Sequence, residues 1–268
     1  MFDYLFFIAA LAIPFFIGGL KTYRKGLVTG LMISLLYWGK ILPILMIVPL
    51  GAAACIYFAA HQSKETKEEV LHVKNPALPM LAVFVVCMAI FCAFEDSFAL
   101  YGSYVGLRSQ TLLLSRDLDK VSFLIGPIIF GNWCDRKGPF SAAIFLTFLA
   151  EISVWCAANT QNFTSLFITG SLLVHLCTSG FFVVLPVIVH TLFGKSHFYR
   201  MYPAMALIAA TAWVSSRLLY LRSWSPSTNP GSFLISLTLL TIVSAFFIYV
   251  AWRRRLSLVT EDHLQKTS

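Results

Sequence analysis

Long apolar runs separated by short polar segments dominate the chain. Residues 2–20 form the first run, and a second run extends over 26–60 after the basic segment 21–25. Beyond the polar segment 61–76 the chain has six further apolar runs, at 79–104, 112–133, 139–158, 163–190, 202–221 and 232–252. Because about 20 consecutive apolar residues allow a helix to cross a bilayer, this pattern predicts an all-α polytopic membrane protein.

The run 26–60 is too long for one membrane span. A single helix of that length would reach about 50 Å at a rise of ~1.5 Å per residue, well beyond a hydrocarbon core of ~30 Å. Trp38-Gly39-Lys40 interrupts the run, so we expect two short spans that meet there. The whole chain then has nine spans, and eight remain the alternative if 26–60 is a single span.

Composition agrees with this fold class. Hydrophobic residues make up 58% of the chain and charged residues 12%, which is half the roughly 25% charge of a soluble domain. A soluble globule, a disordered chain, a collagen-like fibre and a disulfide-rich module are therefore excluded. The six cysteines show no CxxC spacing, so neither a disulfide framework nor a metal site is expected. No HExxH, GxSxG or P-loop motif is present, and we expect neither enzyme activity nor a cofactor.

The net charge of +8 is distributed in the way that orients membrane proteins. Short loops carry the Lys and Arg residues, so the charge does not indicate a nucleic-acid surface. If the tail 253–268 is cytoplasmic, alternation places 14 of the 20 Lys and Arg residues on that side, in the tail and in 21–25, 61–76, 134–138 and 191–201. We expect Met1 outside, a cytoplasmic C-terminus and an integral multi-pass protein of a bacterial inner (plasma) membrane.

A short motif lies between two of the predicted spans. Residues 131–140 read Gly-Asn-Trp-Cys-Asp-Arg-Lys-Gly-Pro-Phe. This string resembles the loop signature of the major facilitator superfamily (MFS), G-x-x-x-D-R-x-G-R-R, in Gly131, Asp135, Arg136 and Gly138. Pro139-Phe140 replaces the basic pair of the family. In the family's twelve-span plan, the second copy of this signature joins spans 8 and 9, and counting from the polar segment 61–76 puts the motif at that junction.

The resemblance implies MFS-type helical bundles and a domain plan. Segment 24–31 is similar to the family's junction of spans 4 and 5, so the chain would correspond to spans 4–12 and would be N-terminally truncated. The expected parts are a partial N-terminal bundle of about three spans, a cytoplasmic linker, a complete C-terminal six-span bundle and a cytoplasmic tail, at 1–60, 61–78, 79–252 and 253–268 respectively.

In the family this loop signature biases one access state of the transporter. Physical chemistry supports part of that role, because the carboxylate of Asp135 can meet the partial positive charge at a helix start. Gly138 permits a sharp turn, and Arg136 can offer paired donors to a carboxylate or to terminal carbonyls. The alternative is a tight turn that obeys the positive-inside rule and has no gating role.

Ionisable side chains inside the predicted spans are candidates for solute or coupling-ion binding, because a charge at bilayer depth costs several kcal/mol unless it is paired or hydrated. Glu95 and Asp96 are adjacent carboxylates that could accept a proton, or else lie hydrated near the outer interface. His175 lies in the middle of a span, as a proton relay or as a hydrogen-bonded packing residue. Arg217 lies deep in its run and needs a partner such as an acidic group, unless it reaches the outer surface.

Arg116, Asp119 and Lys120 have spacings that put them on one helical face. They would line a polar cavity, or lie outside the membrane if the span begins near Val121. We expect secondary active transport of a small solute by alternating access, with an organic anion as the first guess and Glu95 or Asp96 coupling protons. The alternative is a truncated or partial gene product without transport activity. Expected partners are the solute, membrane lipid and a separately encoded N-terminal half.

Overall fold

The computed structural model describes residues 25–41, 77–160, 163–223, 235–250 and 252–253, and these are almost entirely helical. The predicted span 2–20, residues 61–76 of the predicted linker and most of the tail lie outside the described residues. Within the described part there is no β-strand. The all-α prediction is therefore confirmed for these residues.

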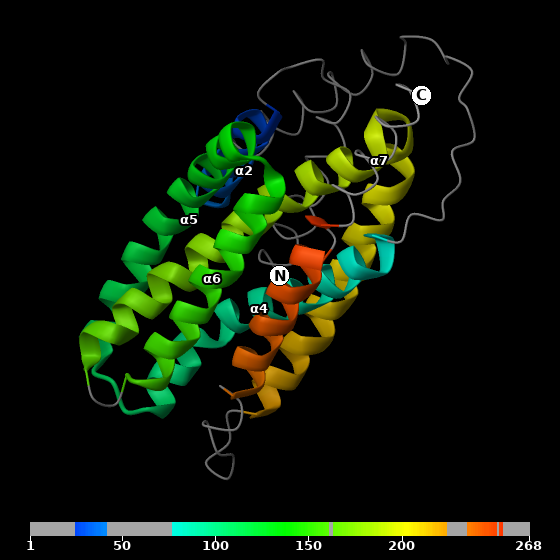
Figure 1. Ribbon diagram of the computed structural model, residues 1–268. Coiled ribbons are helices and arrows are strands. Elements are labelled where there is room, and N and C mark those ends of the chain that lie inside the picture. Colours follow the sequence, from blue (N-terminus) through cyan, green and yellow to red (C-terminus); the bar gives the residue numbers. More distant parts are fainter. Residues whose placement is uncertain (1–24, 42–76, 161–162, 224–234, 251, 254–268) are drawn as a thin grey trace, which may run out of the picture.

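The helices lie side by side in one bundle (Figure 1). Its elements are α2 (Lys25–Ile41), α4 (Ala77–Tyr104), α5 (Ser109–Lys137), α6 (Pro139–Ala158), α7 (Thr164–Ser223) and a further helix, Ile235–Val250. Short connections make α4, α5, α6 and the first half of α7 run alternately up and down. The long α7 packs against α2, α4, α5 and α6, so it forms the centre of the bundle.

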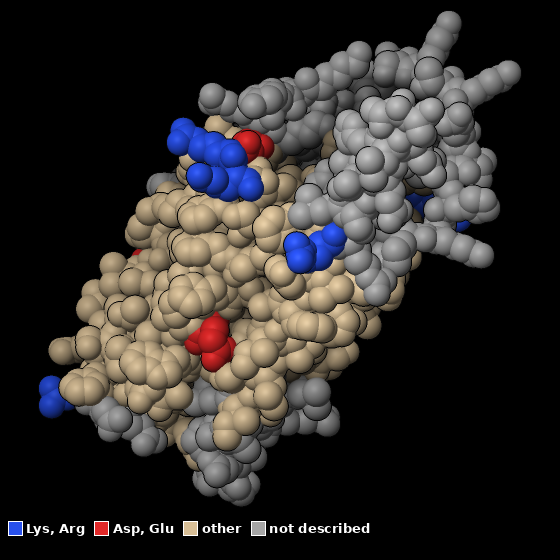
Figure 2. Space-filling view, viewed as in Figure 1, with Lys and Arg blue, Asp and Glu red and all other residues tan. Residues whose placement is uncertain are grey.

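Three helical segments are long and apolar enough to cross a membrane, namely Leu78–Glu95, Pro139–Ala158 and Thr164–Gly194. The helix Ile235–Val250 is also apolar but shorter. Figure 2 shows a largely uncharged face, with Lys and Arg gathered toward its ends and an acidic group in its middle. A helical membrane protein is thus confirmed, and the number of crossings stays a prediction.

One predicted boundary differs from the structure. Residues 191–201, expected as a loop, are helical except at Gly194, where φ is 71° and ψ is 178°. A positive φ is accessible to glycine at little cost, so one residue breaks the helix where a longer loop was expected. α2 ends at Ile41, one residue beyond the junction expected at Trp38–Lys40, and the second short span expected there lies outside the described residues.

Aromatic side chains fill the contact between α4 and α7. The ring centroids of Phe84 and Phe181 are 6.3 Å apart, and those of Phe98 and Phe167 are 4.9 Å apart. A Cβ atom added to Gly102 would lie 2.6 Å from the Phe167 ring, so glycine is required for this approach. Lipid tails are as apolar as these rings, and helix association in a bilayer therefore depends on close packing. This packing sets the position of α4 against α7.

Candidate functional site

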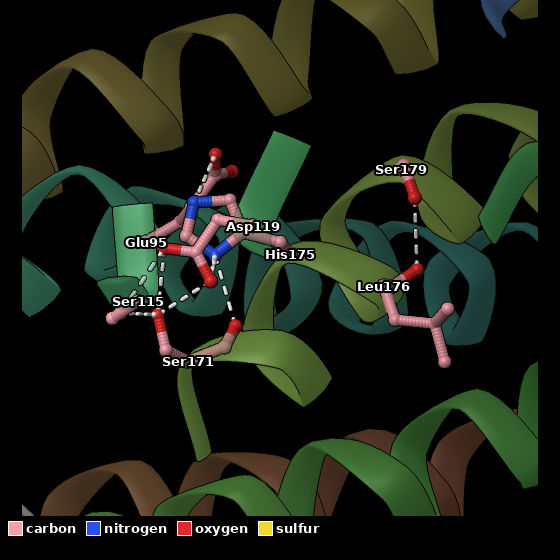
Figure 3. A network of polar contacts seen from close by, with 7 residues as sticks. All are labelled: Glu95, Ser115, Asp119, Ser171, His175, Leu176 and Ser179. Carbon is pink, nitrogen blue, oxygen red and sulfur yellow. Dashed lines mark hydrogen bonds and ion pairs between the residues drawn. The ribbon is translucent and has the colours of Figure 1, made fainter. Parts of the chain in front are cut away.

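Three ionisable side chains from three helices meet inside the bundle (Figure 3). The imidazole of His175 in α7 lies between two carboxyl groups. Its Nε2 is 3.3 Å from Oε1 of Glu95 in α4, and its Nδ1 is 3.4 Å from Oδ1 of Asp119 in α5. We call these three residues the acid–histidine cluster. The sequence indicated Glu95 and His175 as two separate candidates. For Asp119 it left two alternatives open, a place in a polar cavity or a place outside the membrane.

The three residues of the cluster lie at one level of the bundle. Glu95 lies nine residues before the end of α4, Asp119 ten after the start of α5 and His175 eleven after the start of α7. At ~1.5 Å per residue these positions are ~14, ~15 and ~17 Å from the same end of the bundle. α4 and α5 have 28 and 29 residues, so the cluster lies about one third of the way along them from this end.

Two serines complete the cluster. The Ser171 hydroxyl donates to Asp119, at 2.7 Å from Oδ1 and 2.8 Å from Oδ2. The Ser115 hydroxyl lies 2.8 Å from Oγ of Ser171 and 3.4 Å from Oδ2 of Asp119. Side chains of Glu95, Asp119 and His175 are only 19%, 11% and 15% exposed. A buried charge is costly unless hydrogen bonds compensate it, and the serines supply such bonds.

Close packing of α5 on α7 brings Asp119 to His175. Gly126 lies about two turns beyond Asp119, and a Cβ atom added there would lie 2.9 Å from the Leu176 carbonyl oxygen and 2.1 Å from Oγ of Ser179. The Ser179 hydroxyl itself donates to the Leu176 carbonyl at 3.0 Å. The absence of a side chain at Gly126 therefore permits the backbones of α5 and α7 to approach each other about two turns of α5 beyond Asp119.

Ser115 and Ser171 were not among the residues predicted from the sequence, although their spacing could have indicated them. Ser115 precedes Asp119 by four residues, and Ser171 precedes His175 by four. That spacing puts each pair on one helical face. A polar residue one turn before an intramembrane ionisable group is thus the signal that marks a hydrogen-bonding partner.

The remaining candidate residues lie elsewhere. Arg116 is exposed on α5, and Lys120 pairs with the exposed Asp117, Nζ to Oδ1 2.7 Å. Arg217, in the second half of α7, places its guanidinium carbon 5.2 Å from the centre of the Trp213 ring. Asp96 follows Glu95 in α4, and its side chain lies outside the described part. A solute-binding role for these four residues stays a prediction.

The loop signature joins two helices that are far apart in sequence. Oδ1 of Asp135 accepts the Gly26 backbone N–H at 3.0 Å, and Oδ2 accepts that of Leu27 at 2.9 Å. Both amides belong to the first turn of α2, whose N–H groups lack partners within the helix and carry partial positive charge. Asp135 therefore holds the start of α2 against the end of α5. A gating role for this contact stays a prediction.

The other signature residues shape the same end of the bundle. Gly138 has φ of +86° and separates α5 from α6, which begins at Pro139. A Cβ atom added to Gly131 would lie 2.4 Å from the Gly26 carbonyl oxygen. Arg136 is exposed in the last turn of α5. Gly138 thus makes the turn, and Gly131 lets α2 approach closely.

The donor arrangement of the cluster suits protons better than a metal ion. The two ring nitrogens of His175 point in different directions, one toward each carboxyl group. The ring lies between the two carboxyl groups, so a metal ion bound to one ring nitrogen would have only one of these carboxyl groups beside it. Among the described residues, no group of three His, Cys, Asp or Glu side chains is disposed to hold a metal ion.

Comparison with known proteins adds no family to these findings. No protein-family model matches the chain. No curated protein matches it either. The resemblance to the major facilitator superfamily therefore depends on the loop signature at 131–140 and on the order of the predicted spans.

Proposed function

We propose that this protein is a secondary transporter of the MFS type that couples movement of a small solute to movement of a proton. The acid–histidine cluster carries the proposal. Ionisable groups at bilayer depth are rare and mark ion or proton pathways by default. Three of them from three helices, held together by serine hydroxyls, form a site that can gain or lose a proton.

The cluster offers a means of coupling because its contacts join α4, α5 and α7. Imidazole changes its charge near neutral pH more readily than any other side chain. A proton that enters or leaves the site changes the attraction between His175 and the two carboxyl groups. The relative stability of two helix arrangements then depends on protonation, which is what alternating access requires.

The Asp135 contact supports the finer assignment to the MFS type. It joins α2, which the span count assigns to the first bundle, to the last turn of α5, which the span count assigns to the second. Hydrogen bonds from backbone amides to a carboxylate are strong yet can break without unfolding either helix. Such a joint can open and close at one end of the bundle as the two halves move.

The solute remains the least constrained part of the proposal. An organic anion is the first candidate, because Arg116, Lys120 and Arg217 would attract one. Lys120 pairs with Asp117, and Arg217 lies over the Trp213 ring. We therefore assign the solute and the proton to different places. Coupling would then act through helix movement.

Uptake into vesicles tests the proposal. The full chain is reconstituted with a pH-sensitive dye inside, and a panel of labelled short-chain mono- and dicarboxylates is offered with and without an imposed pH gradient. We expect gradient-dependent uptake of at least one carboxylate, with a loss of about tenfold or more in His175→Asn. Glu151→Gln is the control, because Glu151 is also a carboxyl group within an apolar helix but lies outside the cluster.

Two results would contradict the proposal. Uptake that is the same with and without the gradient would exclude proton coupling. Absence of uptake for the whole panel would favour the alternative of a gene product without transport activity.

A further inference from the structure

The hydrogen bonds of His175 identify which ring nitrogen carries a fixed proton. Nδ1 lies 2.9 Å from the backbone carbonyl oxygen of Ser171, one turn earlier in α7. A carbonyl oxygen can only accept a hydrogen bond, so Nδ1 must be the donor and must carry hydrogen. Nδ1 also lies 3.4 Å from Oδ1 of Asp119. The exchangeable position on the ring is therefore Nε2.

Asp119 is surrounded by donors. Its two oxygens accept the Ser171 hydroxyl, and Oδ2 lies within 3.4 Å of the Ser115 hydroxyl. Nδ1 of His175 lies 3.4 Å from Oδ1 and contributes electrostatic attraction when the ring is protonated. A carboxylate is acceptor-only and satisfies all these contacts without a proton of its own. Asp119 therefore acts as a fixed anion that orients the ring.

Glu95 meets the ring on its other side. Its Oε1 lies 3.3 Å from Nε2. If neither group carried a proton, a carboxylate oxygen would face a nitrogen lone pair, and the contact would be repulsive. A hydrogen bond forms only when one proton lies between them, on Glu95 with a neutral ring or on Nε2 with an ionised Glu95.

We propose that the exchangeable proton of the cluster is shared between Oε1 of Glu95 and Nε2 of His175, whereas Asp119 stays ionised and holds the ring. This assignment deepens the proposed function, and its role in transport rests on that function. Loss of the shared proton leaves two acceptors face to face and makes this contact between α4 and α7 repulsive. The α5–α7 link through Asp119 and Ser171 persists, so deprotonation weakens the attachment of α4 more than that of α5.

Other charged residues lie on the helices around the Glu95–His175 pair. The described residues 26–34 of α2 include no charged residue. On the elements packed against the pair, α5 carries Asp119 itself and the exposed Arg116. α6 carries Glu151, which contacts Thr241, and the second half of α7 carries Arg217, which lies over the Trp213 ring. Asp96 adjoins Glu95 in α4. Single substitutions can therefore separate the shared proton from the fixed anion.

Nitrogen NMR of the full chain in lipid nanodiscs tests the assignment directly. Histidine is labelled with ¹⁵N, the His175 signals are identified by their loss in His175→Asn, and spectra are recorded from acidic to alkaline pH. In the wild type, Nδ1 should stay protonated throughout, and one pH-dependent transition should appear at Nε2. Glu95→Gln should lose that transition, because the glutamine amide can donate to Nε2 at every pH. Asp119→Asn should retain it.

A wild-type ring in which Nδ1 loses its proton would overturn the proposal, and so would a transition lost in Asp119→Asn but kept in Glu95→Gln. The wild-type result needs only His175→Asn, for assignment of the signals, so the test holds even if Glu95→Gln or Asp119→Asn disrupts the bundle. Because the spectra are recorded without solute, they also separate two failures. The predicted transitions without proton-coupled uptake would retain the proton site and refute the transport function.

Discussion

At the scale of single residues, the site depends on hydroxyl groups as much as on charges. Ser171 donates to both oxygens of Asp119, and Ser115 donates into the same network. A carboxylate that is 11% exposed would otherwise have few donors to replace water. The serines therefore stabilise the ionised form of Asp119 inside the bundle.

Ser171→Ala should lower the free energy of unfolding by about 1.5–3 kcal/mol, the usual range for a hydrogen bond to a charged group. Thermal unfolding of the purified protein in detergent measures this loss. Thr169→Ala is the matched control, because Thr169 lies on the same helix, is exposed and bonds only to a local carbonyl in the described part. Equal stability of the Ser171→Ala and Thr169→Ala proteins would show that the bonds to Asp119 contribute little.

Glu151 is a second carboxyl group that bonds to a hydroxyl of another helix. The Thr241 hydroxyl lies within hydrogen-bonding distance of a Glu151 carboxyl oxygen and of the Thr238 carbonyl, 2.9 Å away. This contact links α6 to the helix Ile235–Val250.

Glu151→Gln should leave the free energy of unfolding within about 0.5 kcal/mol of the wild type, because the glutamine side-chain oxygen can still accept from Thr241. Glu151→Ala should cost about 1–3 kcal/mol, since it leaves the threonine hydroxyl without this partner. Unfolding in detergent compares the two proteins. A Gln variant as unstable as the Ala variant would contradict a stabilising role for this hydrogen bond.

The sequence identified Glu95, Asp119 and His175 as candidates because charged or titratable residues are costly at bilayer depth. It could not show that they meet. Apolar runs fix the lengths of spans but leave open how each helix is rotated and how far it is shifted along its neighbour. The contact of Glu95 with His175 depends on both quantities. The same uncertainty left Arg116 and Lys120 on one expected face with Asp119, whereas the structure exposes both and buries only Asp119.

At the scale of elements, α2 and α5 approach so closely that backbone meets backbone. A Cβ atom added to Gly30 would lie 2.1 Å from the Pro127 carbonyl oxygen, and one added to Gly26 would lie 2.6 Å from that of Gly131. The Ser34 hydroxyl donates to the Leu124 carbonyl at 2.8 Å. Small residues four apart are typical of tightly packed membrane helices.

Gly30→Ala should separate α2 from α5, because the added methyl group collides with backbone that cannot rotate away. Hydrogen exchange of the α2 amides should become faster by about tenfold or more. Leu31→Ala is the control, since Leu31 is 44% exposed and its truncation leaves the contact with α5 intact. Unchanged exchange in Gly30→Ala would contradict the packing described for this helix pair.

Asp135 contributes to the same pair through hydrogen bonds. Asp135→Ala should expose the Gly26 and Leu27 amides and speed their exchange by about tenfold or more, since a bond to a charged group is worth ~1.5–3 kcal/mol and ~1.4 kcal/mol corresponds to a factor of ten. Arg136→Ala should have little effect on these two amides. Equal protection of both amides in the wild type and in Asp135→Ala would contradict the role of Asp135 as the hydrogen-bond acceptor at the start of α2.

Element boundaries were predictable where polar residues bound a run and less so where one residue makes the turn. The structure begins and ends α6 at the residues that the sequence predicts, 139 and 158, because Gly138 and Pro139 mark its start. The break at Gly194 was expected as a longer loop because Lys195 and Arg200 suggested a polar segment. A helix that continues through such residues at a bundle end cannot be distinguished from a loop by hydropathy alone.

At the scale of the whole molecule, two features lie at different depths of one bundle. The Asp135 joint connects α2 to α5 at one end, and the acid–histidine cluster connects α4, α5 and α7 about one third of the way along from the other end. Because α5 takes part in both, a movement of α4 that follows loss of the shared proton can alter how α5 packs against its neighbours. The proposed coupling of proton movement to alternating access uses this arrangement.

The central claim is that one proton shared by Glu95 and His175 couples transport. Vesicles containing Glu95→Gln test it most directly, with a labelled carboxylate that the wild type accumulates. The glutamine imitates a permanently protonated site, so exchange of labelled for unlabelled solute should continue whereas accumulation driven by a pH gradient should be lost. Accumulation at the wild-type level by Glu95→Gln would contradict the claim.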